Sequence, residues 1–199
     1  MPTEIILAST STIRQDLLKN AGVEFNAVAP RVDEEMIRDS LLANNASPRD
    51  IADQLAEAKA RKVASKHPNA MVLACDQILQ IGDTILNKPK TKDEAHAQLT
   101  RLVGQSHRLI SAAVVYENLK PVWRTIGVVK LHMRTPSPEY LDSYIERNWD
   151  SIRFSVGGYK LEEEGARLFH KIEGDYFNVL GIPLLDVLAY FTLRGVIDG

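Results

Sequence analysis

The first residue that could do chemistry is an aspartate in a strongly apolar run. Asp76 stands within Val72–Leu79, followed directly by Gln77. Burying an unpaired carboxylate costs roughly several kcal/mol. Two interpretations meet this cost: Asp76 faces a cleft, where it holds a divalent ion or orients a water, or it forms a salt bridge with one of the 24 basic residues. The residues alone leave both open.

A run of hydroxyl side chains is the second candidate. Ser9–Thr12 precedes a helical pattern that starts at Ile13 and includes Arg14. The N–H groups of a helix N-terminus beside a guanidinium suit a phosphate. The alternative is that Ser11 or Thr12 only caps the helix. P-loop and GxGxxG spacings are absent, so neither a P-loop kinase nor a Rossmann dehydrogenase is supported.

Scattered charges form the third candidate group. Lys59, Lys88 and Lys160 are each compatible with a solvated surface group, although Pro89 would hold Lys88 in an extended loop. The acidic run Asp33–Glu35 is either a solvated turn or the source of a second carboxylate for Mg²⁺.

Several other chemistries are not supported. The five histidines are dispersed without HExxH spacing, so no zinc site is expected, and His107 fits a structural hydrogen-bonding role. No GxSxG motif occurs. Cys75, the one cysteine, cannot form an internal disulfide and is expected to be a small buried side chain.

Net charge and hydropathy limit which classes of partner and which cellular location are expected. A net charge of -2 argues against a nucleic-acid partner. No apolar run approaches the ~18 residues of a membrane span, and the N-terminus fits a first strand better than a signal peptide. A cytoplasmic protein without a membrane partner is therefore expected.

Strand-like runs alternate with helical periods, which predicts an α/β fold in a single domain of residues 1–199 with two lobes. No Pro/Gly/Ser-rich linker marks a boundary. Strands are expected at 4–8, 23–29, 71–79, 107–116 and 122–133; helices are expected from Ile13 to Gly22, from Ser47-Pro48, from Thr91 to Gly104, from Ser137 to about Arg147, and from Pro183 or Leu184 to Gly195.

In their order and spacing these pieces resemble the Maf family of nucleoside triphosphate pyrophosphatases, from Ile5 to about Leu188. The stretches that carry the resemblance are Leu7-Ala8-Ser9-Thr10-Ser11 with Arg14, Val32-Asp33-Glu34, Leu55-Ala56 with Lys59-Ala60, Cys75-Asp76-Gln77, Lys88-Pro89, Leu102 and Gly104 with His107, Glu173-Gly174-Asp175, Asn178-Val179 and Gly181-Ile182-Pro183-Leu184.

The resemblance implies hydrolysis of a nucleotide between its α- and β-phosphates, giving the monophosphate and pyrophosphate with Mg²⁺ or Mn²⁺. The aspartate matching Asp76 is the family's catalytic acid/base residue, and Glu34 would join it around metal and water. The residues that would meet the phosphates are Ser9, Ser11, Arg14, Lys59 and Lys88. The implied fold has an elongated, bent mixed β-sheet flanked by helices, with two lobes enclosing a cleft. Many members are homodimers.

Three positions bear on the substrate. Gln77 and Glu162 resemble the subgroup that acts on 7-methyl-GTP, and a carboxylate at 162 could accept from guanine N1–H and the 2-amino group. Ile13 departs from that subgroup, where a tryptophan would stand, and Ser155 replaces an expected lysine. The alternatives are a dTTP/UTP-specific enzyme of the same family and a catalytically silent nucleotide-binding regulator of cell division.

Overall fold

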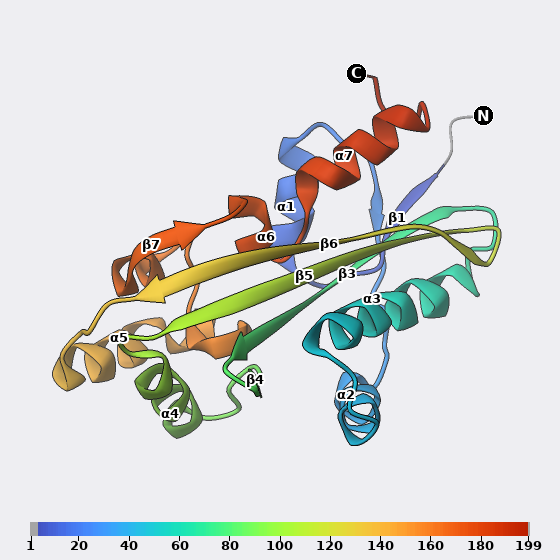
Figure 1. Cartoon of the computed structure of the whole chain (residues 1–199). Helices are drawn as coiled ribbons and strands as arrows, with labels where there is room; N and C mark the ends of the chain where they lie inside the picture. The colour runs from blue at the N-terminus through green and yellow to red at the C-terminus, as the bar shows by residue number, and fades with distance from the viewer. Residues whose placement is uncertain (1–3, 199) are drawn as a thin grey trace. The chain divides into compact units, whose positions relative to one another are not determined.

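The computed structural model describes residues 4–198. Its strands are β1 (Ile5–Leu7), β2 (Asn26–Ala27), β3 (Met71–Ile81), β4 (Thr84–Leu86), β5 (Ser106–Glu117), β6 (Lys120–Met133) and β7 (Phe169–Glu173) (Figure 1). Its helices are α1 (Thr12–Asn20), α2 (Glu34–Ala43), α3 (Pro48–Ala64), α4 (Lys92–Leu102), α5 (Pro138–Ile152), α6 (Tyr176–Val179) and α7 (Leu184–Leu193), with two 3₁₀ turns, η1 (Val156–Gly158) and η2 (Glu164–Leu168).

The strands form one mixed sheet in the order β2-β1-β3-β5-β6-β7, with β4 paired to β3. β1 runs parallel to both β2 and β3, whereas the β3–β4 and β6–β7 pairs are antiparallel. The register places Ile5 opposite Met71 and Leu7 opposite Leu73. The predicted α/β class and mixed sheet are confirmed.

The chain divides into two compact units. The first comprises the chain up to Gln77, then Ser111–Gly127 and the chain from Gly181 onward; the second comprises Ile78–Ile110 and Val128–Leu180. Strands β3, β5 and β6 each contribute residues to both units. Because the units interleave along the chain, no linker separates them.

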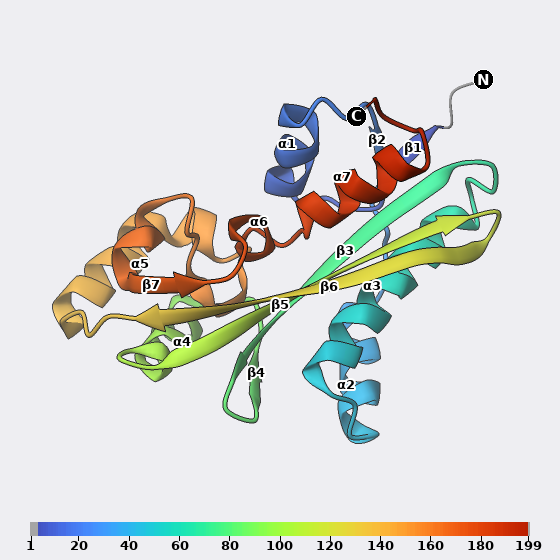
Figure 2. The ribbon, with the colours of Figure 1, turned by 45° about the horizontal axis from the view of Figure 1, so that its top comes forward.

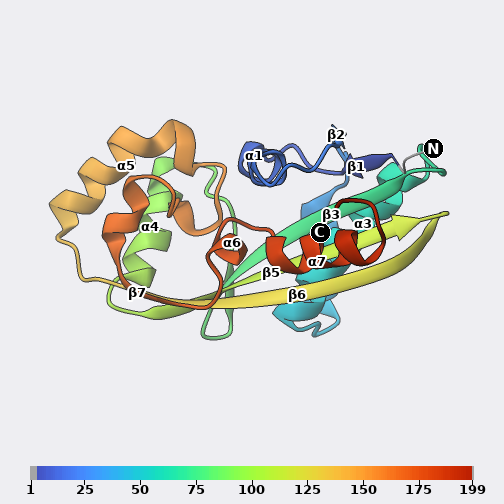
Figure 3. The same ribbon diagram turned by 90° about the horizontal axis from the view of Figure 1, so that it is seen from above.

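In the first unit, helices cover both faces of the sheet. Figures 1 and 3 show α3 on one face and α7 on the other. Side chains alternate along β6, so Trp123 stacks on Tyr190 of α7 with ring centroids 4.8 Å apart, while Arg124 donates to Glu57 of α3 over 2.9 Å. This alternation holds the sheet between the two helices.

The second unit has a core of its own. Its helices α4 and α5 lie side by side, and β7 pairs with the end of β6 (Figure 2). Leu99 of α4, Tyr144 of α5 and Leu131 of β6 are completely buried in one cluster. Within that cluster Tyr159 and Phe169 meet edge to face, with centroids 4.8 Å apart.

Local sequence signals explain most helix starts. Ser47 and Asp50 form a reciprocal capping box at the start of α3, with Pro48 in the first turn. Thr91 and Ser137 accept from the backbone N–H groups of Glu94 and Tyr140 and so cap α4 and α5. The helices predicted from these signals are confirmed.

Three expectations need correction. The strand predicted over 23–29 contains only Asn26–Ala27, which pair with Ile6 and Leu7 of the short strand β1. The acidic run is no solvated turn, since Asp33 accepts from the N–H of Met36 and starts α2. Helix α5 continues to Ile152, five residues past the expected end, where Ile152 is buried.

The hairpin of β5 and β6 closes through Asn118 and Leu119, whose φ angles of 51° and 62° are those of a type I′ turn. The two strands predicted here are confirmed; β5 is one residue longer at each end, and β6 starts two residues earlier. Within the described residues, every helix is too short or too polar to cross a lipid bilayer.

Candidate active site

Three predicted residues of the first unit meet around one ammonium group. The Nζ of Lys59 lies 2.6 Å from Oδ1 of Asp76 and 2.9 Å from Oε1 of Glu34. Lys59 comes from the buried face of α3, Asp76 from β3 and Glu34 from the first turn of α2. Only 7% of the Lys59 side chain and 8% of the Asp76 side chain are exposed, against 40% for Glu34. The cluster is therefore open to solvent on the Glu34 side.

The two carboxylates keep Lys59 charged. Burial lowers the pKa of this lysine and Arg14 nearby lowers it further, but the charges of Asp76 and Glu34 outweigh both, so the pKa is raised above its ordinary value. The ammonium in turn compensates the buried charge of Asp76. Of the two interpretations of Asp76, the salt bridge is the one seen here, and it involves Lys59, which the resemblance assigned to phosphates.

Arg14 is held beside this cluster by backbone carbonyls. Its Nε donates to the carbonyl of Gly181 over 2.7 Å and its Nη1 to that of Cys75 over 2.9 Å. The carbonyl of Cys75 belongs to the peptide bond that leads to Asp76, so the guanidinium ties α1 to the strand that carries this carboxylate. These carbonyls carry no formal charge, so the positive charge of Arg14 is balanced by the net negative charge of the neighbouring Glu34, Lys59 and Asp76.

The hydroxyl-rich loop is arranged around Ser9. Ser9 is buried, and its Oγ accepts from the N–H of Ser11 over 3.1 Å. Ser11 occupies the N-cap position of α1, yet its side chain makes no capping hydrogen bond. The simple capping interpretation is therefore wrong for Ser11, and the N-terminus of α1 keeps its positive end available to an anion.

The neighbours of Asp76 have distinct environments. Cys75 is completely buried, and burial raises its pKa to about 11, so the thiol stays protonated as expected for a packing residue. The Nε2 of Gln77 donates to the Oγ of Ser111 over 3.1 Å, which fixes the amide to β5. Ile13 is half-buried in the first turn of α1.

The remaining predicted residues belong to the second unit. Lys88 is exposed just before the buried Pro89, and Glu162 is exposed between Leu161 and Glu163. Lys160 pairs with Glu163 over 3.1 Å. His107 is buried and shares a 2.7 Å hydrogen bond with the hydroxyl of Tyr159, which confirms its structural role.

Gly181 is a residue for which sequence reasoning assigned no role. Its φ is 89°, and a Cβ added there would lie 2.8 Å from Nη2 of Arg14. A side chain at this position would therefore displace the guanidinium. The only available signal was the glycine directly before Ile182-Pro183, at the end of the last quoted motif.

The donor set suits a hard divalent cation. Two carboxylates from different elements, Glu34 and Asp76, converge on one positive charge, and Mg²⁺ is commonly held by one or two carboxylates plus substrate phosphates. Among residues 4–198 no group of three or more His, Cys, Asp or Glu side chains forms a complete metal cage. The residues present therefore fit a metal whose coordination the substrate completes.

Comparisons with known proteins cover nearly the whole chain. The family model described as Maf-like protein matches residues 4–193. A nucleoside triphosphate pyrophosphatase of Ruegeria pomeroyi is 59% identical over 100% of both chains, and one of Caulobacter vibrioides is 48% identical over 98% of both. A 7-methyl-GTP pyrophosphatase of Brucella abortus is 41% identical over 100% of both. Because the family model spans all but the last five of the described residues, the protein belongs to the Maf-like family.

Proposed function

We propose that this protein is a nucleoside triphosphate pyrophosphatase that cleaves the α–β phosphoanhydride and releases the nucleoside monophosphate and pyrophosphate. The observation that carries the proposal is that the carboxylates of Glu34 and Asp76 converge on the buried ammonium group of Lys59. Relatives named for this activity, up to 59% identical over the full chain, support it.

The chemistry needs a positioned water and charge compensation on phosphoryl oxygens, with little covalent participation by the protein. Asp76 would orient the water and accept its proton as the water oxygen bonds to the α-phosphorus and the bond to the bridging oxygen breaks. Lys59 would hold the Asp76 carboxylate in place. Pyrophosphate leaves with the bridging oxygen, and Arg14 with the N-terminus of α1 would balance phosphate charge.

Mg²⁺ or Mn²⁺ is the proposed cofactor. Glu34 and Asp76 would hold the cation, which would supply compensation for the charge of the phosphoryl oxygens. We expect chelation with EDTA to abolish turnover and added Mg²⁺ or Mn²⁺ to restore it.

The base preference follows from Gln77 and Glu162. We infer a preference for guanine-type bases, including 7-methylguanine, because a carboxylate accepts from N1–H and the 2-amino group and attracts a cationic base. The Brucella relatives named 7-methyl-GTP pyrophosphatase support this base preference. Relatives of higher identity carry the broader name nucleoside triphosphate pyrophosphatase. Lys88, Ser9 and Ser11 are assigned to the phosphates by the family resemblance.

The central test is pyrophosphate release from a panel of GTP, 7-methyl-GTP, dTTP and UTP, with wild type beside Asp76→Asn. Loss of a positioned base predicts a fall in kcat of roughly 10²-fold or more. Asp83→Asn, at an exposed carboxylate in the β3–β4 turn, is the control and should retain full activity. Unchanged turnover in Asp76→Asn would refute the role of Asp76, and nucleotide binding without product from wild type would favour a silent regulator.

The pyrimidine-specific alternative is separated by Glu162→Gln. A carboxylate that reads guanine predicts a selective loss of kcat/KM for GTP and 7-methyl-GTP, with dTTP and UTP little changed. A wild type that prefers dTTP or UTP would decide for the alternative.

We also propose a homodimer in the cytoplasm, on the basis of the family resemblance and the single buried cysteine. Light scattering coupled to size-exclusion chromatography measures the assembly directly, and a mass near 22.2 kDa would contradict the dimer.

A further inference from the structure

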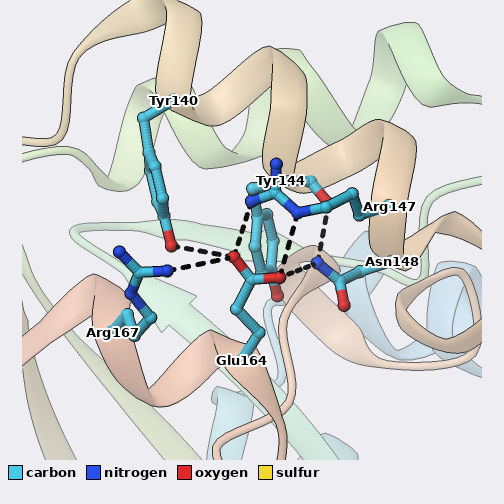
Figure 4. Close-up of polar contacts among 6 residues, drawn as sticks. All are labelled: Tyr140, Tyr144, Arg147, Asn148, Glu164 and Arg167. Atoms are coloured by element: carbon cyan, nitrogen blue, oxygen red, sulfur yellow. Dashed lines mark hydrogen bonds and ion pairs between the residues drawn. The ribbon is translucent and has the colours of Figure 1, made fainter.

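A second carboxylate lies two residues beyond the proposed base-reading Glu162, and its surroundings are unusual for a surface group. Glu164 accepts hydrogen bonds from Nη2 of Arg147 at 2.6 Å and from Nδ2 of Asn148 at 2.8 Å (Figure 4). The hydroxyl of Tyr140 donates to it over 3.1 Å, and Nη1 of Arg167 lies 3.7 Å away. One carboxylate thus gathers four side chains, three of them from α5.

The cluster is braced by the aromatic ring of Tyr140. The guanidinium carbons of Arg167 and Arg147 lie 5.1 Å and 6.0 Å from the ring centroid. Contacts to Arg147 and Asn148 lower the pKa of Glu164 to about 2, so the carboxylate is ionised throughout the neutral range. The contacts therefore persist throughout the neutral range.

The segment before Glu164, residues 159–163, is fixed at further points. Tyr159 is buried in the core of the second unit against His107. Glu163 accepts from the Oγ of Ser151 on α5 at 2.7 Å and pairs with Lys160. A Cβ at Gly165 would lie 2.3 Å from the carbonyl oxygen of Lys160, so the chain folds back on itself where only glycine fits.

Glu162 is the exception within this segment. It is exposed, and within residues 4–198 it makes no hydrogen bond or ion pair. An exposed glutamate has several rotamers, so the backbone that carries it must be fixed if its carboxylate is to be placed accurately. Anchors at 159, 163 and 164 on both sides of Glu162 provide that restraint.

We infer that Glu164, through its contacts with Tyr140, Arg147 and Asn148, is a positioning residue that sets base preference by holding Glu162 in place. The inference rests on the proposed function, since it presumes that Glu162 reads the base. Stability alone explains the cluster less well. Of the clustered side chains only Tyr140 packs against the buried core of the second unit, and an ion pair with the half-exposed Arg147 adds little stability.

The test compares Glu164→Gln with wild type on GTP, 7-methyl-GTP and UTP, measuring kcat and KM separately. We expect the ratio of kcat/KM for 7-methyl-GTP over UTP to fall by about 10- to 100-fold, with most of the change in KM for the guanine nucleotides. Turnover of UTP should stay within about twofold, because the groups around Asp76 belong to the other unit.

Glu146→Gln is the matched control. Glu146 is an exposed carboxylate of α5, the helix that carries Arg147 and Asn148. It pairs with Lys92 over 2.6 Å, but this pair joins α5 to α4 and does not contact the Glu162 segment. Its loss should leave the nucleotide ratio unchanged. Tyr140→Phe removes a single donor to Glu164 and keeps the inference testable if Glu164→Gln fails to fold, with a smaller fall in the same ratio expected.

The outcomes distinguish a failure of the positioning role of Glu164 from a failure of the proposed function. A wild type that favours guanine nucleotides and loses this preference in Glu162→Gln, but keeps it in folded Glu164→Gln, overturns the inference and leaves the proposed function intact. An equal loss for all three nucleotides also overturns it, since that is a general structural effect. A wild type without base preference, or without turnover, contradicts the proposed function itself and the inference with it.

Discussion

Lys59 supplies the positive charge that compensates the buried Asp76 carboxylate. Two carboxylates and one ammonium give this cluster a net charge of minus one, and Arg14 lies close enough to influence it. A metal bound by Glu34 and Asp76 would compete with Lys59 for the same oxygens.

Gly181→Ala tests the placement of Arg14. The added methyl would lie 2.8 Å from the guanidinium, so we expect Arg14 to be displaced and KM for nucleotide to rise about 10-fold or more. Positive φ strain should add about 1–2 kcal/mol of destabilisation. Steady-state kinetics and urea unfolding measure the two effects.

Gly22→Ala is the control for Gly181→Ala. Its φ of 76° imposes similar strain, but no atom lies within 4 Å of the added Cβ. It should lower stability and leave KM unchanged. Equal KM values for the two variants would contradict the role of Gly181.

His107 predicts a pH dependence of stability. Burial, with a smaller effect from His132, lowers its pKa from 6.5 to about 4. Between these values the unfolded chain binds a proton that the folded chain rejects, so stability should rise with pH across pH 4–6.5, by up to about 1.4 kcal/mol per pH unit. Urea unfolding of wild type and His107→Phe measures it, and the slope should flatten in the variant.

At the scale of elements, helix starts were the most predictable feature and short or solvent-facing elements the least. The pattern Ser47-Pro48-Arg49-Asp50 predicts the capping hydrogen bonds between Ser47 and Asp50, and α3 begins there. Helix α2 was missed because none of its residues is fully buried and its acidic start, Glu34 and Glu35, favoured a solvated turn. Strand β7 was missed for the same reason, since four of its five residues are exposed.

Two N-cap serines predict opposite effects. Ser47→Ala should destabilise the protein by about 1 kcal/mol, because the side chain accepts from the N–H of Asp50. Ser11→Ala should have almost no effect on stability, since Ser11 makes no side-chain cap, but it should weaken nucleotide binding if the α1 N-terminus holds phosphate. Thermal unfolding with and without nucleotide distinguishes them; a loss of stability in Ser11→Ala equal to that in Ser47→Ala would refute the distinction.

At the scale of the whole molecule, the fold class could be predicted from the sequence, whereas the meeting of Lys59 with Glu34 and Asp76 could not. Asp76 drew attention as a charge in an apolar strand, and Lys59 gave no such signal because it lies on a helix with many other charges. That Lys59, Glu34 and Asp76 meet depends on α2, α3 and β3 packing in three dimensions. The division into interleaved units has no linear signal at all.

Each unit contains one of the two tryptophans, Trp123 in the first and Trp149 in the second. Because β3, β5 and β6 run through both units, we expect single-tryptophan variants, Trp149→Phe and Trp123→Phe, to report coincident urea midpoints. Fluorescence unfolding curves measure this. Circular dichroism of each variant measures how much the substitution itself changes stability. Fluorescence midpoints that differ by more than this change would instead indicate that the two units unfold independently.

The interleaving also sets an order of events during synthesis. The second unit is complete once Leu180 has left the ribosome, whereas the first still lacks α7, against whose Tyr190 Trp123 stacks. Asp76, Lys59 and Arg14 are thus translated early, before α7 and before Gly181, whose carbonyl accepts from Arg14. A nascent chain arrested before Gly181 would contain Glu34, Lys59 and Asp76 but would lack the carbonyl that holds Arg14 beside them.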